Sequence, residues 1–255
     1  YGTDTIPRCA AVVGPGNRWV LEAKRQVAGE VIIDSPAGPS EVLVIADEGC
    51  APPAWLAAEL VAQAEHDPDA AVAFVTTSPS LLEAVGRELE AQVAASPRAD
   101  VIRTALETCG AMLLADDHDE MLVFADAYAA EHLSLCTRDP AADRPRLSTP
   151  GTVFLGGSSS VAFGDYMTGA NHVLPTAGTA RSFSGLGALD FLRSYTWQSL
   201  TPEAAAAMAE PVAVLAEAEG LPGHAAAARM RALEAEDGPA GGATGWGGDE
   251  RGGTS

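Results

Sequence analysis

Gln63 and His66 lie three positions apart in a stretch of sequence that reads as a helix. Residues at this spacing share one helix face, so the amide oxygen and the imidazole could both reach a single metal ion. A solvated helix end is the commoner meaning of such a pair. Glu65 points away from that face and is expected to be structural or solvated.

A second candidate is the adjacent pair Glu131 and His132, between a predicted helix and a predicted apolar strand. Sites in α/β proteins gather where strands and helices meet. Neighbouring Glu and His side chains can divide acid and base roles, because their pKa values differ and each can be tuned. The structural alternative is a charge pair at a helix terminus, where His is favourable.

The third candidate segment is GDYMTGANHVLPT, residues 164–176, and its Gly-, Thr- and Pro-rich stretch with Asn171 and His172 is not expected to form a regular element. Asp165 is a candidate hard ligand, and Asn171 and His172 follow it. In such a loop, polar groups usually bond to the backbone, which is the structural alternative for Asn171.

Glu219 and His224 form the last candidate group, between two predicted helices near the C-terminus. A capping or solvated role is the structural alternative for both. His118, in the acidic run ADDHDE, is expected to be exposed and without function.

One Gln, two His and one Asp would give a mixed nitrogen and oxygen ligand set, which zinc accepts. A neutral amide ligand leaves the ion with net positive charge, suited to holding the imidazole and amine nitrogens of a substrate. Manganese or cobalt would also fit such a site. Because the candidates lie in separate segments, spacing alone leaves a metal site and a chance scatter of polar residues both open.

An α/β framework must position these residues. Its elements alternate along the chain, with predicted strands at 31–33, 41–47, 71–77, 111–115, 133–136 and 152–156 and predicted helices at 18–27, 55–65, 81–95, 101–109 and 120–130. This alternation predicts a mostly parallel sheet covered by helices. After Gly185 the pattern becomes helical, with predicted helices at 186–195, 202–219 and 223–236.

The composition excludes several classes of partner. Fifteen Lys and Arg against 35 Asp and Glu give a formal net charge of −20, which repels nucleic acid and anionic membranes. The sequence has no apolar run long enough to span a bilayer and no signal-peptide pattern at its start. Four widely spaced cysteines without a CxxC pair are typical of free or buried thiols in a reducing cytosol. A cytoplasmic location is therefore expected.

Seven segments together resemble the histidinol dehydrogenase family. In the family's order and approximate spacing they are GPGNRWVLEAKRQVAGEV, SPAGPSEVLVIAD, AQAEHDPDA, AAEHLSL, GDYMTGANHVLPTAGTAR, SGLGALDFLR and AEGLPGHAAAARMR. Each segment is modestly specific, and seven in order are highly specific. The resemblance covers about residues 1–236 and matches the C-terminal part of the family sequence, whose long preceding segment is absent.

The resemblance implies a zinc-dependent oxidation of L-histidinol to L-histidine by NAD, through histidinaldehyde, at the end of histidine biosynthesis. The implied ligands of one zinc ion per subunit are Gln63, His66, Asp165 and His224. Glu131 and His132 would be the catalytic pair, and Asn17 would contact NAD. The implied histidinol contacts are the zinc ligands together with Ser40, His132, His172 and Glu219.

The resemblance also implies the domain organisation. Residues 1–39 would be the remnant of an NAD-side α/β domain, and 40–186 the main part of a second α/β domain with an incomplete Rossmann-like sheet. Residues 187–236 would form a helical dimerisation module, and the glycine-rich tail 237–255 is expected to be disordered. Relatives are homodimers whose helical module crosses to the partner, so Glu219 and His224 would complete the other subunit's site.

The sequence departs from the family pattern in places. Ala130 stands where relatives usually carry proline, Asp126 where asparagine is common, and one extra residue lies within 49–55. Three interpretations stay open: part of a histidinol dehydrogenase, a related zinc- and NAD-dependent dehydrogenase of another small alcohol, or a non-catalytic metal-binding remnant if the chain starts at Tyr1. His172 and Glu219 favour histidinol, because they match positions that contact its polar groups.

Overall fold

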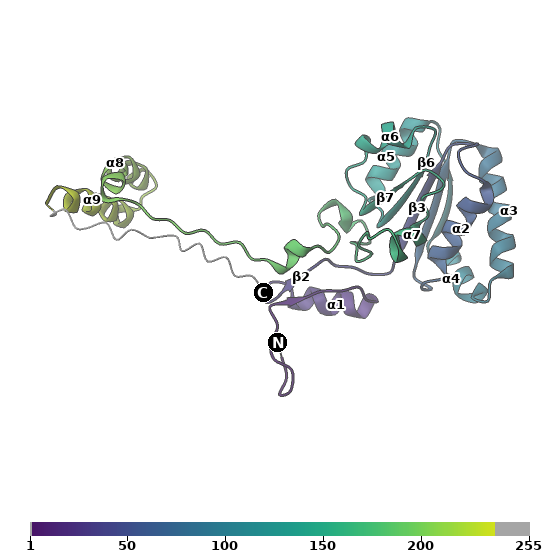
Figure 1. The fold of residues 1–255 in the computed structure, drawn as a ribbon, viewed down its shortest axis with the longest axis horizontal. Helices are drawn as coiled ribbons and strands as arrows, with labels where there is room; N and C mark the ends of the chain where they lie inside the picture. Colours follow the sequence, from purple (N-terminus) through teal and green to yellow (C-terminus); the bar gives the residue numbers. More distant parts are fainter. Residues whose placement is uncertain (1, 238–255) are drawn as a thin grey trace, which may run out of the picture. The chain divides into compact units, whose positions relative to one another are not determined.

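The computed structural model describes residues 2–237 and divides into two compact units, Tyr1–Arg193 and Ser194–Ser255 (Figure 1). The predicted domain boundaries after residues 39 and 186 stay predictions. The predicted disordered tail lies, apart from Asp237, outside the described residues. Among the described residues, no helix is long and apolar enough to cross a membrane.

The first unit is built around a five-stranded sheet in the order β5-β4-β3-β6-β7. Its strands are β3 (Glu41–Ala46), β4 (Ala71–Thr76), β5 (Gly110–Leu114), β6 (His132–Cys136) and β7 (Thr152–Leu155). Every neighbouring pair in this sheet is parallel. The predicted α/β class, with a mostly parallel sheet, is therefore confirmed.

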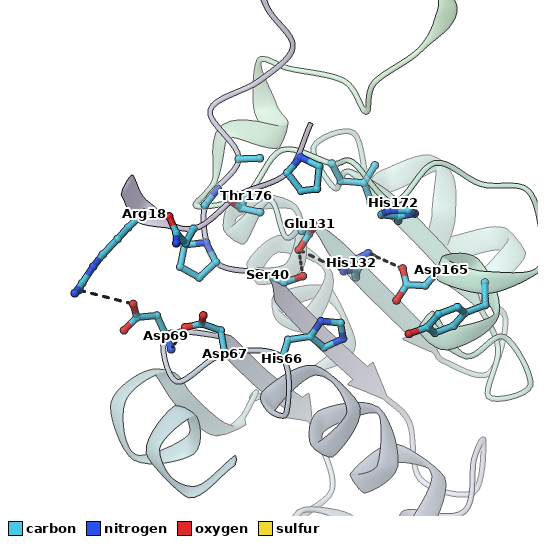
Figure 2. A pocket seen from close by; sticks show the side chains of 18 residues that line it. Arg18, Ser40, His66, Asp67, Asp69, Glu131, His132, Asp165, His172 and Thr176 are labelled. Carbon is cyan, nitrogen blue, oxygen red and sulfur yellow. Dashed lines mark hydrogen bonds and ion pairs between the residues drawn. The ribbon is translucent and has the colours of Figure 1, made fainter. Parts of the chain in front are cut away.

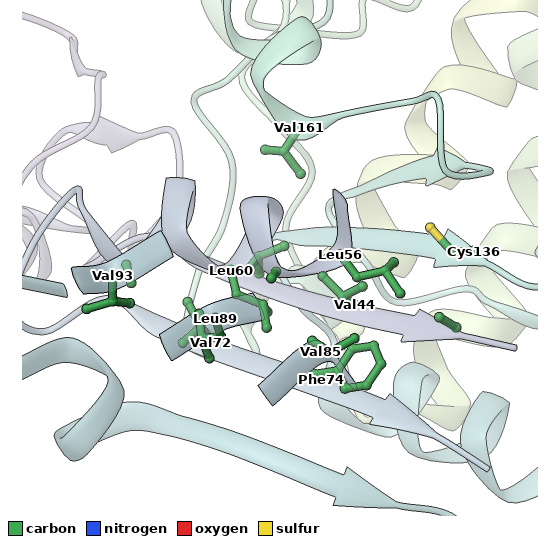
Figure 3. Close-up of a cluster of buried hydrophobic side chains, with 14 of the residues drawn as sticks. Val44, Leu56, Leu60, Val72, Phe74, Val85, Leu89, Val93, Cys136 and Val161 are labelled. Atoms are coloured by element: carbon green, nitrogen blue, oxygen red, sulfur yellow. The ribbon is translucent and has the colours of Figure 1, made fainter. Parts of the chain in front are cut away.

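Helices cover both faces of the sheet, which explains why β3 is apolar throughout its centre. Val42 and Val44 pack into a cluster with α2 (Pro53–Ala64), α3 (Pro79–Ala95) and α4 (Ala99–Cys109), as Figure 3 shows in part. Leu43 and Ile45 point to the other face and pack with α5 (His118–Tyr128). Alternate side chains of one strand thus enter two cores.

The N-terminal segment forms a smaller parallel pair, β1 (Ala11–Val12) and β2 (Ile32–Ile33), joined by α1 (Arg18–Val27). A buried ion pair fixes the turn after β1. The Lys24 Nζ atom lies 2.6 Å from Asp34 Oδ1, and the backbone N–H of Gly14 donates to Asp34 Oδ2 at 2.7 Å. Gly14 has a φ of 120°, which favours glycine at this position.

One prediction about the segment after β7 is confirmed and another was wrong. The residues from Thr168 to Thr176 are irregular as expected, and Asp165 before them lies in a short helix, α7 (Val161–Tyr166). The predicted helix at 186–195 is a single 3-10 turn, Ala188–Phe191. Leu189 is 80% exposed and Leu192 67% exposed, so no packed apolar face stabilises a longer helix there.

His118 is half-exposed and not simply solvated, because it pairs with two carboxylates. Its Nε2 atom lies 2.9 Å from Asp143 Oδ1, and its Nδ1 atom 3.6 Å from Asp47 Oδ1. The hydrogen bond with Asp143 is the main reason that the pKa of His118 is raised. Asp143 ends α6 (Pro140–Asp143) and also accepts a hydrogen bond from Thr137 Oγ1 at 2.5 Å. His118 therefore joins α5 to the carboxyl end of the sheet.

The second unit contains α8 (Pro202–Ala218) and α9 (Pro222–Asp237). Thr201 caps α8 by accepting a hydrogen bond from the backbone N–H of Ala204 at 3.2 Å, as the Thr-Pro helix start predicts. Ala213, Ala216 and Ala225 form the buried contact between the two helices. The remaining 3-10 turns of the described chain are Arg144–Arg146 and Thr179–Arg181.

Candidate active site

A pocket of about 400 Å³ lies at the amino end of the large sheet (Figure 2). Ser40 directly precedes β3, Glu131 and His132 stand at the start of β6, and His66 lies in the turn before β4. Ligands of open α/β sheets usually bind at the carboxyl ends of the strands. Here Ser40, His66 and Glu131 come from the segments that precede β3, β4 and β6, so they meet at the opposite edge.

Glu131 is the most perturbed carboxyl group of this pocket. Its side chain is buried, and its Oε2 atom accepts hydrogen bonds from Ser40 Oγ at 2.6 Å and from the backbone N–H of Glu41 at 2.8 Å. Burial raises its pKa to about 8, although these two hydrogen bonds act in the opposite direction. A carboxyl group with such a pKa can exchange a proton near neutral pH.

His132 lies beside Glu131 and is equally buried. Its Nδ1 atom is 3.2 Å from the backbone oxygen of Glu41, and its Nε2 atom is 4.0 Å from Asp165 Oδ1. If Nδ1 carries the proton and donates to that carbonyl, Nε2 presents a lone pair toward Asp165. Burial lowers the pKa of His132, which favours the neutral, proton-accepting form.

Three of the four predicted metal ligands line one small pocket, which contains Gln63, His66 and Asp165. The apolar stripe of α2 packs against the sheet, and Gln63 beside it is 4% exposed. Its Nε2 atom is buried without a hydrogen-bond partner. This amide therefore has an unused polar group in the pocket that His66 and Asp165 also line.

The fourth predicted ligand, His224, lies in the first turn of α9, and Glu219 lies at the C-terminal cap of α8. Both are exposed and belong to the second unit. Within the described residues there is no group of three or more His, Cys, Asp or Glu side chains that could hold a metal ion. Of the predicted zinc ligands, the first unit therefore supplies the side chains of His66 and Asp165 and the amide of Gln63.

The candidate residues in the loops differ in whether their side chains are free to contact a ligand. His172 lines the main pocket, whereas Asn171 bonds to the backbone of Val173 and Leu186, its structural alternative. Asn17 also lines the pocket, but its Oδ1 atom caps α1 by accepting from the N–H groups of Trp19 and Val20. Only the NH₂ group of Asn17 is left to contact a cofactor.

Sequence reasoning missed two residues that shape this pocket. Glu41 is a charged residue 6% exposed at the start of β3. Thr176 is buried and accepts a hydrogen bond from the backbone N–H of Gly38 at 2.6 Å, which joins two loops of the pocket. The sequence did contain a signal for Glu41, because a carboxylate at the first position of a fully buried strand requires specific partners.

The chain is similar to proteins of one known family. The family model described as histidinol dehydrogenase matches residues 1–232. Histidinol dehydrogenase of Halobacterium salinarum is 50% identical over 232 residues, covering 91% of this chain and 54% of that protein. The Thermus thermophilus protein of the same name is 47% identical, with coverages of 91% and 56%.

A solved structure gives the same result for the fold. The crystal structure of histidinol dehydrogenase from Elizabethkingia anophelis matches with a TM-score of 0.84 and 37% identity, covering 92% of this chain and 54% of that one. The chain spans about half the length of the relatives that it matches.

Proposed function

The chain belongs to the histidinol dehydrogenase family, and from that premise we propose that the protein oxidises L-histidinol to L-histidine through histidinaldehyde, reducing one NAD in each of two steps. The observation that carries the proposal is the buried Glu131–His132 pair, whose side chains meet in a pocket with Ser40, His66, Asp165 and His172. We also propose a cytoplasmic location, because the free thiols of the chain stay reduced there.

His132 would take the hydroxyl proton of histidinol while hydride passes from the same carbon to nicotinamide. A neutral imidazole with a lowered pKa suits this task. Glu131, in its ionised form, would then take a proton from water as the water oxygen bonds to the aldehyde carbon. The resulting hydrate loses a second hydride and a proton, which yields the carboxylic acid.

We infer that Gln63, His66 and Asp165, together with His224 of the partner subunit, hold a zinc ion. The unpartnered buried amide beside an imidazole and a carboxylate supports this assignment. When bound, the ion would supply a positive charge that holds and orients the imidazole and amine nitrogens of the substrate.

Activity of the full gene product tests the proposed reaction. We expect two NADH and one L-histidine for each L-histidinol consumed. Preferential oxidation of another small alcohol would favour the related dehydrogenase, and no oxidation by a zinc-loaded, folded protein would favour a non-catalytic remnant.

Gln63→Ala is expected to weaken zinc binding by at least about tenfold, since removing even an outer-shell partner of a ligand has such effects. Metal content after dialysis against a graded series of chelator concentrations measures this loss. Glu65→Gln is the matched control, because this half-buried residue lies at the same helix end and is not in the ligand set. Equal zinc retention in wild type and Gln63→Ala would contradict the assignment.

We also propose a homodimer in which Glu219 and His224 complete the site of the partner subunit. Mixing His224→Ala chains with His132→Ala chains would then create one intact site in each mixed dimer. Random pairing predicts recovery of about a quarter of wild-type activity after co-refolding. Absence of recovery, with mixed dimers shown by differential tags, would place each site within one chain.

A further inference from the structure

We propose that Glu41 is a positioning residue of this active site, whose carboxylate holds the Glu131–His132 turn and the loop at 172–178 in one arrangement. The test by kcat rests on the proposed function. The test by amide hydrogen exchange rests only on the contacts of Glu41.

The side chains of Glu41 and Glu131 are tied to each other's backbone. Glu41 Oε1 accepts a hydrogen bond from the backbone N–H of Glu131 at 3.1 Å, and Glu131 Oε2 accepts from the backbone N–H of Glu41 at 2.8 Å. The backbone oxygen of Glu41 lies 3.2 Å from His132 Nδ1. One residue at the start of β3 therefore contacts both members of the catalytic pair.

The same carboxylate reaches a third segment. Burial raises the pKa of Glu41, and the backbone N–H groups of Ala177 and Gly178 act on its carboxylate as donors that lower this pKa. These consecutive residues have φ values of 54° and 71° and form the centre of a turn, which the N–H group of Thr179 closes by donating to the backbone oxygen of Thr176 at 3.1 Å. The turn presents its backbone N–H groups to the Glu41 carboxylate.

The loop that ends at this anion contact carries part of the pocket wall. His172, Leu174 and Thr176 all line the main pocket. Without the carboxylate, the turn at 176–179 keeps its own hydrogen bonds but loses the negative charge that its N–H groups act on. The distance between His172 and the catalytic pair would then no longer be fixed by Glu41.

A purely structural role explains this residue less well. Glu41 is a second buried carboxylate beside Glu131, and its charge is one of the causes that raise the pKa of Glu131. In one desolvated place, the charge of one carboxyl group opposes ionisation of the other. An uncharged side chain would serve a simple strand start better, whereas a carboxylate can accept from three backbone donors at once.

Glu41→Gln in the full gene product tests the proposal. The amide keeps the size of the side chain but replaces one acceptor oxygen with an NH₂ group, which cannot accept from the backbone donors. We expect kcat for histidinol to fall about 10- to 100-fold, in line with a displacement of catalytic groups by about 1 Å, while KM for NAD stays within twofold. Amide hydrogen exchange over 172–181 should become faster.

Two further variants complete the experiment. Glu48→Gln is the matched control, because Glu48 is exposed at the other end of β3. Glu41→Asp keeps the charge and should retain part of the kcat that Glu41→Gln loses. It also provides a test of the proposal if Glu41→Gln does not fold.

Turnover of Glu41→Gln within twofold of wild type, or a loss of turnover that matches the loss of folded protein, would overturn the proposal. Unchanged exchange over 172–181 would overturn it as well. If the wild-type protein oxidises no histidinol, the proposed function fails by itself, and the exchange measurement alone decides the role of Glu41.

Discussion

His132→Ala should lower the rate of the first oxidation about 10²- to 10⁴-fold, the range typical for loss of a general base. The backbone oxygen of Glu41 fixes one ring nitrogen of His132, and the other faces Asp165 across the pocket. The measurement is the first NADH formed in a single turnover with histidinol.

The matching variant Glu131→Gln should slow mainly the second oxidation, because the amide cannot take a proton from water. Supplying histidinaldehyde directly isolates this step, and its single-turnover rate should fall far more than the rate with histidinol. His118→Ala is the control, since His118 pairs with Asp143 at the opposite edge of the sheet. Equal losses in both steps for both variants would contradict the division of roles.

The elements of the large sheet were predictable because each has a strong local pattern. The apolar run at 41–47 became the fully buried centre of the sheet, and the stripe of Leu56, Leu60 and Ala64 became the buried face of α2. In both cases burial follows the residue's position in its own element, so neighbouring sequence is sufficient. The helix at 186–195 failed because its apolar residues have no packing surface in the described chain.

Local pattern could not show partners that come from distant segments. The donors to the Glu41 carboxylate stand at Glu131, Ala177 and Gly178, about 90 to 137 positions away. His118 acquires partners from Asp47 and Asp143 in the same way. The sequence therefore indicated which residues could carry chemistry, but only the parallel strand order shows that Ser40, His66 and Glu131 meet at the amino edge.

Glu131→Gln should also make the protein more stable at alkaline pH, by an amount that grows with pH. The Glu131 side chain is 5% exposed, and burial raises its pKa from 4.5 to about 8. The native state therefore holds its proton where the unfolded state has lost it, so ionisation of this group destabilises the native state. That cost is absent below about pH 4.5, grows between pH 4.5 and 8, and is complete above pH 8.

The amide removes this cost but keeps an oxygen that can accept from Ser40 and Glu41. We expect Glu131→Gln to exceed wild type in free energy of unfolding by roughly 1–3 kcal/mol at pH 8.5, a discounted fraction of the full shift, and by little at pH 5. Urea unfolding across this pH range measures the difference, and Glu90→Gln, an exposed Glu on α3, shows the effect of the same exchange at the surface.

A lower stability of Glu131→Gln at every pH would mean that the carboxylate supports the fold. Higher stability at pH 8.5 together with a slowed second oxidation would mean that Glu131 serves the reaction and not the fold. A buried group whose removal stabilises the protein and abolishes one chemical step is present for that step, because its ionised form opposes folding. The same comparison therefore separates a catalytic Glu131 from a structural one.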